Sequence, residues 1–153
     1  MTELSSARVR VPCSTSNLGA GFDTLGLALD RFLDVSFTPD SSGALRVVRE
    51  GTLRALLEDE TDIVAEILKR RVADVDVSGV LKMHSDIPVG RGLGASAAAR
   101  VAGYDLALAV QGLPRDAAAT FDSALGRRGT EIMRLQAYSV ASGRWLKLKM
   151  APW

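Results

Sequence analysis

The sequence predicts a domain that mixes β-strands with α-helices. Residues 8–13, 33–38 and 80–87 alternate polar and apolar side chains, which is the period of a half-buried strand. Residues 61–73 repeat apolar side chains at helical spacing, and residues 95–110 are rich in alanine, a strong helix former. With 153 residues, of which 47% are apolar, the chain suits one compact domain or slightly more.

Composition excludes several classes of function. Lysine and arginine total 19 against 18 acidic residues, so the net charge of +1 offers no strong field for nucleic acid or a membrane surface. The single cysteine, Cys13, excludes an internal disulfide, and the single histidine, His84, excludes a multi-histidine metal centre. No apolar run is long enough to cross a membrane and no apolar leader is seen, so we expect a cytoplasmic protein.

The strands are expected to pair through local turns. Small polar residues and glycines at 14–23 predict a loop after the first strand. Residues 44–48 are expected to form a β-hairpin with residues 33–38, across a turn at 39–43.

The first helix, residues 61–73, begins at a capping signal, Thr61-Asp62. It ends in the basic run Lys69-Arg70-Arg71, which suits the negative end of the helix dipole and is interpreted as a solvated end rather than a binding patch. The packing residues expected on the second helix, 95–110, include Ala97, Val101, Tyr104 and Leu108.

The most informative segment is a glycine loop at residues 87–100, which read I-P-V-G-R-G-L-G-A-S-A-A-A-R. Its glycines, Gly90, Gly92 and Gly94, let backbone amides turn inward and let a ligand approach closely. The first turn of the next helix adds amides without intrahelical partners and the positive end of a dipole. These features predict a site for an anion, best a phosphate, to which Ser96 can add a hydroxyl, or offer it to magnesium.

Two other interpretations of the loop stay open. No Gly-Lys-Ser/Thr follows, so it is not a Walker A loop, but residues 92–97 fit the dinucleotide pattern G-x-G-x-x-A. The preceding strand carries Lys82, His84 and Asp86, unlike the buried apolar strand of a Rossmann core. A glycine turn that binds nothing is the remaining alternative.

Two motifs in this chain resemble those of a known family. Residues 88–97 read P-V-G-R-G-L-G-A-S-A, similar to the P-x-x-x-G-L-G-S-S-A phosphate loop of the GHMP kinase superfamily. Residues 12–29 read P-C-S-T-S-N-L-G-A-G-F-D-T-L-G-L-A-L, which resembles the P-A-T-x-x-N-L-G-x-G-F-D-x-L-G-x-A-L motif of its homoserine kinase family. The resemblance covers about residues 7–120, with both motifs in the family's order.

The resemblance implies ATP-dependent phosphorylation of the side-chain hydroxyl of L-homoserine, a step toward threonine. The implied fold is α+β, like domain 2 of ribosomal protein S5, with a separate C-terminal domain that is missing here. Asn17 and Asp23 are expected to contact homoserine. The residues expected to wrap the ATP phosphates are Pro88, Val89, Gly90, Arg91, Gly92, Leu93, Gly94, Ala95, Ser96, Ala97 and Ala98.

The chemistry of these residues agrees with the resemblance. Asn17 offers both a donor and an acceptor to a zwitterion, and Asp23 can pair with its ammonium group or orient its hydroxyl. Asx residues beside glycines also serve as turn formers, which is the alternative for both. Ala95 stands where the family has serine, so a Mg²⁺ ligand is expected from Ser96 alone, and no catalytic residue is assigned.

Three functions are therefore considered: a homoserine kinase, a non-catalytic nucleotide-binding fragment, and another GHMP kinase of the mevalonate or shikimate type. The expected partners are ATP and L-homoserine, with no nucleic acid and no membrane, and a homodimer is also considered. Cys13 is expected to be buried and inert, and His84 to be structural rather than catalytic.

The last part of the chain differs in kind. We expect residues 1–121 to form the ATP-binding domain, and residues 122–153 to be an aberrant tail, out of frame or disordered. The family's third motif resembles E-G-H-x-D-N-x-A-P-x-L-x-G-G and is absent as written. Reverse translation from Arg127, shifted to begin at the third base of each codon, permits E-G-H-R-D-N-A-A-P-G-L-L-G-G. This agreement predicts a one-base slip between about residues 112 and 127.

Overall fold

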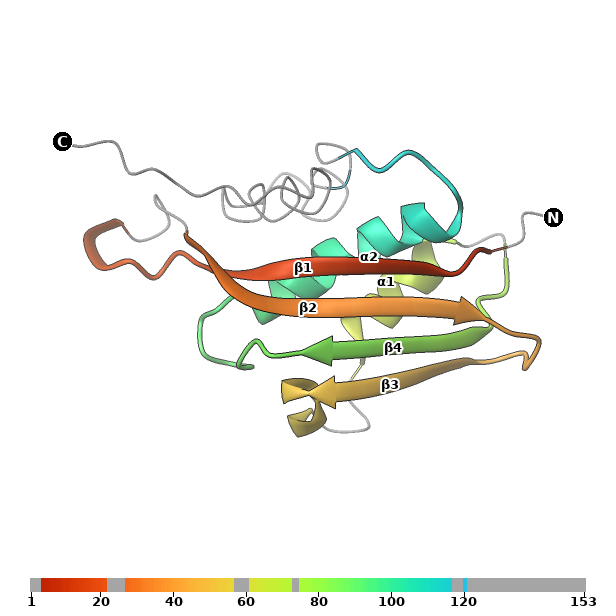
Figure 1. Cartoon of the computed structure of the whole chain (residues 1–153), viewed down its shortest axis with the longest axis horizontal. Coiled ribbons are helices and arrows are strands. Elements are labelled where there is room, and N and C mark those ends of the chain that lie inside the picture. Colours follow the sequence, from red (N-terminus) through yellow and green to blue (C-terminus); the bar gives the residue numbers. More distant parts are fainter. Residues whose placement is uncertain (1–3, 22–26, 57–60, 73–74, 117–119, 121–153) are drawn as a thin grey trace.

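The computed structural model describes residues 4–21, 27–56, 61–72, 75–116 and 120. Its regular elements are β1 (Ala7–Thr15), η1 (Gly19–Gly21), β2 (Leu27–Pro39), β3 (Leu45–Gly51), η2 (Thr52–Ala55), α1 (Ile63–Arg71), β4 (Gly79–Ser85) and α2 (Ala95–Val110). The strands form one sheet in the order β1-β2-β4-β3, and both α-helices lie against the same face of it (Figure 1). This arrangement confirms the α+β fold. The tail expected at 122–153 lies outside the described residues.

The antiparallel pair β1 and β2 forms one side of the sheet. Val9 lies opposite Val35 and Val11 opposite Leu33, and all four side chains are buried. The register shifts after Pro12, which lacks the N–H that a regular ladder would use. Both strands are predicted by the alternation in the sequence, and both extend further than predicted.

The hairpin expected between residues 44–48 and β2 is wrong. β3 pairs in parallel with β4, and β4 lies between β3 and β2. The physical reason is burial, because Leu81 and Met83 of β4 are 0% and 2% exposed whereas Val47 and Val48 of β3 are 38% and 40% exposed. The more apolar strand takes the interior position, and α1 supplies the crossover that a parallel pair requires.

The helices begin where the sequence predicts. At α1 the Asp62 carboxylate accepts a hydrogen bond from the amide of Ala65 at 3.0 Å, which confirms the cap, and the basic run lies in the last turn. α2 occupies the predicted residues, 95–110. Neither α-helix of the described part of the chain has the length and apolarity that a membrane crossing requires.

Small residues let α1 and α2 approach closely. A Cβ added at Gly103 would lie 3.0 Å from Cβ of Ile67, so a larger residue does not fit between the helices. Of the packing residues expected on α2, Ala97 and Val101 are buried, whereas Tyr104 and Leu108 are half-buried because they lie at the margin of the buried stripe.

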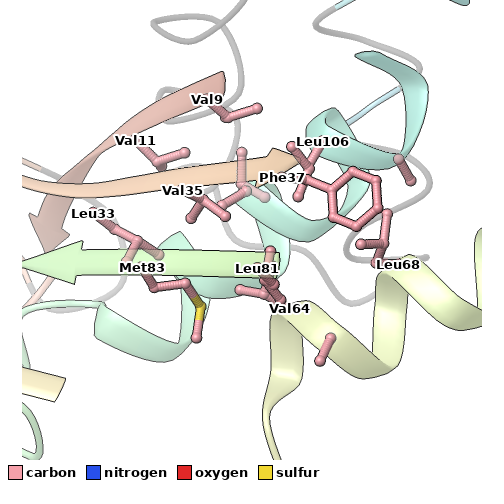
Figure 2. Packing of buried hydrophobic residues seen from close by; sticks show 14 of the residues in the cluster. Val9, Val11, Leu33, Val35, Phe37, Val64, Leu68, Leu81, Met83 and Leu106 are labelled. Carbon is pink, nitrogen blue, oxygen red and sulfur yellow. The ribbon is translucent and has the colours of Figure 1, made fainter. Parts of the chain in front are cut away.

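The core fills the space between the sheet and the helices (Figure 2). Its largest side chains come from strands β1, β2 and β4 and from both helices. Among the labelled members are Val9, Val11, Leu33, Val35, Phe37, Val64, Leu68, Leu81, Met83 and Leu106. Burial of these apolar surfaces is the main stabilising contribution.

The opposite side of the sheet, here called the open face, is polar. Arg8 of β1 pairs with Asp34 of β2 at 3.4 Å, and Lys82 of β4 pairs with Glu50 of β3 at 2.9 Å. Because its side chains are charged, this face is compatible with direct contact with water.

A buried ion pair fixes the segment that follows α2. Asp105 is 1% exposed, and its carboxylate accepts two hydrogen bonds from the guanidinium of Arg115, one of them 2.8 Å from Nε to Oδ1. The hydrogen bond to Asp105 raises the pKa of Arg115. A bidentate pair of this kind holds both side chains in one geometry.

We predict that Arg115→Ala lowers the free energy of unfolding by about 2 kcal/mol, because it leaves the Asp105 carboxylate buried and unpaired. Solvent near the exposed side of the pair offsets part of the loss. Urea denaturation followed by circular dichroism measures this. The control is Arg100→Ala, an exposed position of α2, the helix that carries Asp105, and we expect a change below about 0.5 kcal/mol. Equal effects of the two variants would contradict the structural role of the pair.

Candidate functional site

The glycine loop between β4 and α2 has the conformation that its glycines allow. Gly90, Gly92 and Gly94 have φ values of +71°, +70° and +70°, in the left-handed region that other residues rarely adopt. Gly94 is the N-cap of α2 and provides no side-chain cap. The first hydrogen bond across this cap runs from the amide of Ala98 to the carbonyl of Gly94 at 2.9 Å. The amides of the first turn before Ala98 are therefore left for a ligand or water.

The end of β1 lies directly against this loop. The amide of Ser14 donates to the carbonyl of Leu93 at 3.2 Å. A Cβ added at Gly94 would lie 2.8 Å from the carbonyl oxygen of Ser14, and one added at Gly92 would lie 2.7 Å from Nδ2 of Asn17. The two sequence motifs, distant in the chain, thus meet at one place.

Ser14 is also unusual in its burial. Its side-chain oxygen is enclosed behind the loop and has no hydrogen-bond partner among the described residues. Asn17, by contrast, is exposed, and its backbone amide donates to Oγ1 of Thr15 at 3.2 Å. The burial of the Ser14 hydroxyl shows that β1 packs tightly against the loop. The side chain of Asn17 is exposed and therefore accessible to a small molecule.

Other residues singled out in the sequence have definite places. Ser96 is exposed in the first turn of α2. Asp23 lies outside the described residues. Cys13 is fully buried in β1, and burial raises the pKa of its thiol. His84 points to the open face, where its Nδ1 lies 3.9 Å from Oε2 of Glu50.

Beside the loop is an apolar cavity of about 390 Å³ that sequence reasoning missed. Its floor comes from the sheet, its sides from the first turns of both helices, and its remaining wall from η2. The lining includes Leu33, Leu53, Leu56, Ile63, Met83, Ile87, Val89, Ala95 and Ser96. Since these residues come from several separate segments, no local pattern in the sequence indicates the cavity.

Polar contacts hold the wall of this cavity in place. Oγ1 of Thr52, in η2, lies 2.7 Å from the carbonyl of Ile87 and 3.1 Å from that of Ser85, so its one proton bridges η2 to the start of the loop. Arg49 and Asp62 form a largely buried ion pair at 3.2 Å on the cavity lining. The cavity and the loop are thereby parts of one connected structure.

The described residues contain no group of three or more histidine, cysteine, aspartate or glutamate side chains placed to hold a metal ion. Around the loop they offer backbone amides and one exposed hydroxyl, that of Ser96. This donor set suits an anion with several oxygens.

Comparison with known proteins identifies the family of this chain. A family model described as the GHMP kinases N terminal domain matches residues 55–132, which is half of the chain. The chain belongs to the GHMP kinases. The resemblance to the GHMP kinase superfamily is thereby confirmed. The glycine loop lies inside the matched range, and the motif at residues 12–29 lies outside it.

The relatives of this GHMP kinase domain are longer proteins. A homoserine kinase from Corynebacterium diphtheriae is 42% identical over 112 residues, covering 71% of this chain and 36% of that protein. A solved structure from Listeria monocytogenes, assigned as a homoserine kinase, is 31% identical with a TM-score of 0.67, covering 86% of this chain and 47% of that one. The chain spans about a third of the length of the curated relatives it matches.

A more distant likeness concerns the fold alone. The structure of a mevalonate kinase from methicillin-resistant Staphylococcus aureus is 16% identical, with a TM-score of 0.65, and covers 91% of this chain and 51% of that one. The two proteins therefore share an arrangement of sheet and helices.

We predict that alanine at Gly94 is more destabilising than alanine at Gly90. Both residues have nearly the same positive φ, which costs a non-glycine residue about 1 kcal/mol. At Gly90 a Cβ meets nothing within 4 Å, whereas at Gly94 it meets the backbone of Ser14 at 2.8 Å. Urea denaturation is expected to show a loss of about 1 kcal/mol for Gly90→Ala and at least about 2 kcal/mol for Gly94→Ala. Similar losses would mean that β1 does not pack on the loop as described.

Proposed function

We propose that this GHMP kinase domain binds ATP and takes part in transferring its terminal phosphoryl group to the side-chain hydroxyl of L-homoserine. The observation that carries the proposal is the meeting of the two motifs, with the Asn17 amide against the glycine loop at Gly92. Relatives named homoserine kinase, 42% identical in the case of Corynebacterium diphtheriae, support the choice of substrate. The product would be O-phospho-L-homoserine, on the route to threonine.

In this proposal residues 88–98 hold the phosphates of ATP. The positive φ values of the glycines leave amides available to phosphate oxygens, and the N-terminus of α2 adds the favourable end of its dipole. The neighbouring cavity of about 390 Å³ suits the base, because it is apolar and within the size range of small-molecule sites, about 300–1,000 Å³. Phosphates and base would then lie side by side, as one nucleotide requires.

Asn17 and Asp23 are proposed to hold the amino acid. The exposed side chain of Asn17 offers a donor and an acceptor beside the loop, as the carboxylate and ammonium groups of a zwitterion require. Asp23 is assigned by the motif alone. A hydroxyl held here is presented to the phosphoryl group, and positioning of this kind is the main requirement of phosphoryl transfer.

The transfer forms a bond between the homoserine oxygen and phosphorus and breaks the bond from that phosphorus to ADP, with release of the hydroxyl proton. Mg²⁺ bound with ATP would neutralise charge on the phosphates. The described residues fit this ion in part, since Ser96 presents an exposed hydroxyl in the first turn of α2 while Ala95 supplies none. No residue is proposed as the general base that accepts the hydroxyl proton. A cytoplasmic location stays a prediction.

The second candidate is a nucleotide-binding fragment without turnover. This candidate is favoured by the absence of the family's third motif, which is expected after α2 and does not occur in the sequence as written. If the proposed one-base slip is correct, sequencing the gene between the codons for residues 112 and 127 will reveal it. An uninterrupted frame through codon 153, together with the matching intact mass of the protein, would exclude it.

A coupled assay of ADP release separates the candidates. We expect turnover with L-homoserine and none with mevalonate or shikimate. Nucleotide binding without turnover on any acceptor would favour the fragment. Turnover with mevalonate or shikimate but not homoserine would contradict the assigned substrate, and absence of nucleotide binding would contradict the site itself.

Charge at Gly90 tests the phosphate site directly. We predict that Gly90→Asp weakens binding of ADP at least about tenfold more than Gly90→Asn, since a carboxylate near the phosphates costs about 1.4 kcal/mol or more. The two variants share shape and backbone strain, and a side chain at this position enters open space. Isothermal titration calorimetry measures both. Equal affinities would place the phosphates elsewhere. Gly94 is unsuitable for this test, because its Cβ would point at Ser14.

A further inference from the structure

An ion pair lies on the wall of the apolar cavity. Nε of Arg49, near the end of β3, lies 3.2 Å from Oδ2 of Asp62, the residue that caps α1. The two side chains are only 15% and 11% exposed, and both belong to a cavity lining that is otherwise mainly apolar. Because burial of charged groups is costly even when they are paired, packing alone does not explain a charged pair at this place.

The negative charge of Asp62 makes its partner necessary for a ligand in the cavity. Its Oδ1 accepts a hydrogen bond from the amide of Ala65 at 3.0 Å, and an uncharged asparagine would cap the helix as well. A ring that fills the cavity removes water from the carboxylate beside it. If that carboxylate had no partner, the cost of its lost hydration would weaken binding of the ring.

The pair also borders a more polar hollow. This hollow, of about 730 Å³, is lined by Arg49 and Asp62 together with Arg54, Glu66 and Lys69. The pair is therefore shared between an apolar cavity and charged surroundings. If Arg49 lost its partner, its long side chain could turn toward water in the hollow, whereas the short side chain of Asp62 would stay at the cavity wall.

We propose that Arg49 is a positioning residue for the base of the nucleotide, a role that rests on the proposed function. By pairing with Asp62 it neutralises the wall of the cavity and ties the first turn of α1 to β3. The base then fills the cavity without removing water from an uncompensated charge. Arg49 acts on the base through Asp62, and not on the phosphates, which the glycine loop is proposed to hold.

Binding of ADP to variants of the whole chain, measured by isothermal titration calorimetry, tests this role. Arg49→Met keeps the length of the side chain but leaves Asp62 unpaired, and it should weaken binding at least about tenfold. Asp62→Asn leaves Arg49 unpaired and should cause a smaller loss, since arginine can turn toward water. The double variant removes both charges, and its affinity should return to within about threefold of the wild type.

The matched control is Arg46→Met, on the same strand. Arg46 pairs with Asp40 at 3.0 Å, but its side chain is 64% exposed and does not belong to the cavity lining. Loss of a surface pair of this kind should change ADP affinity less than about twofold. Circular dichroism checks that each variant is folded. If Arg49→Met does not fold, the proposal still requires Asp62→Asn to bind ADP more weakly than the double variant.

Competition by inorganic pyrophosphate separates a role at the base from a general structural role. Pyrophosphate has no ring, so its displacement of ADP reports on the phosphate site alone. We expect its dissociation constant to change less than about threefold in Arg49→Met at about 0.15 M salt, where exposed charges more than about 8 Å apart are largely screened. A variant that merely loosened the domain would lose affinity for both ligands alike.

Several results would overturn the role of Arg49 alone. These are an unchanged ADP affinity in Arg49→Met, a double variant that binds no more tightly than Arg49→Met, equal losses for ADP and pyrophosphate, and pyrophosphate that fails to displace ADP from the wild type. In each case the wild-type chain still binds ADP, so the proposed nucleotide site stands. A wild-type chain that binds no ADP would contradict the proposed function and the role of Arg49 together.

Discussion

The candidate site depends on one backbone contact, in which the amide of Ser14 donates to the carbonyl of Leu93. This hydrogen bond joins the end of β1 to the glycine loop and brings Asn17 against Gly92. The contact is possible because the loop has no side chain at Gly94, where a Cβ would lie 2.8 Å from the carbonyl oxygen of Ser14 in β1. The glycines of the loop therefore have two roles. They leave room for the anion that the loop is proposed to bind, and they let β1 pack against the loop.

The local elements of this domain could be predicted because their signals are local. The cap at Asp62, the basic last turn of α1 and both bounds of α2 follow from residues adjacent in the chain. The pairing of β3 could not be predicted in the same way. The alternation at residues 44–48 indicates a strand but not its neighbour, and β4, which takes the interior position, comes later in the chain. The helix between β3 and β4 is the signal of a parallel crossover, and the hairpin prediction did not use it.

The candidate site also has a part that local motifs predict and a part that they do not. The loop and the Asn17 segment are contiguous motifs, so their chemistry could be described from the sequence, and the structure adds that they are neighbours. The apolar cavity is assembled from β2, β3 with η2, α1, β4, the glycine loop and α2, and each contributes only one or a few residues. None of these residues is distinctive in its own segment. Such a cavity becomes visible only when the topology of the sheet is known.

The Thr52 hydroxyl has a consequence for how ligands are selected. It fastens η2, which forms part of the cavity wall, to the carbonyls of Ser85 and Ile87, from which the loop departs. The distance between the apolar cavity and the proposed anion site is consequently fixed in part by this hydroxyl. A ligand whose aromatic group and phosphates are joined by a linker of another length would have to break this fastening to fill both compartments. Under the proposed function, the domain would therefore select ligands by the length of this linker as well as by their chemical groups.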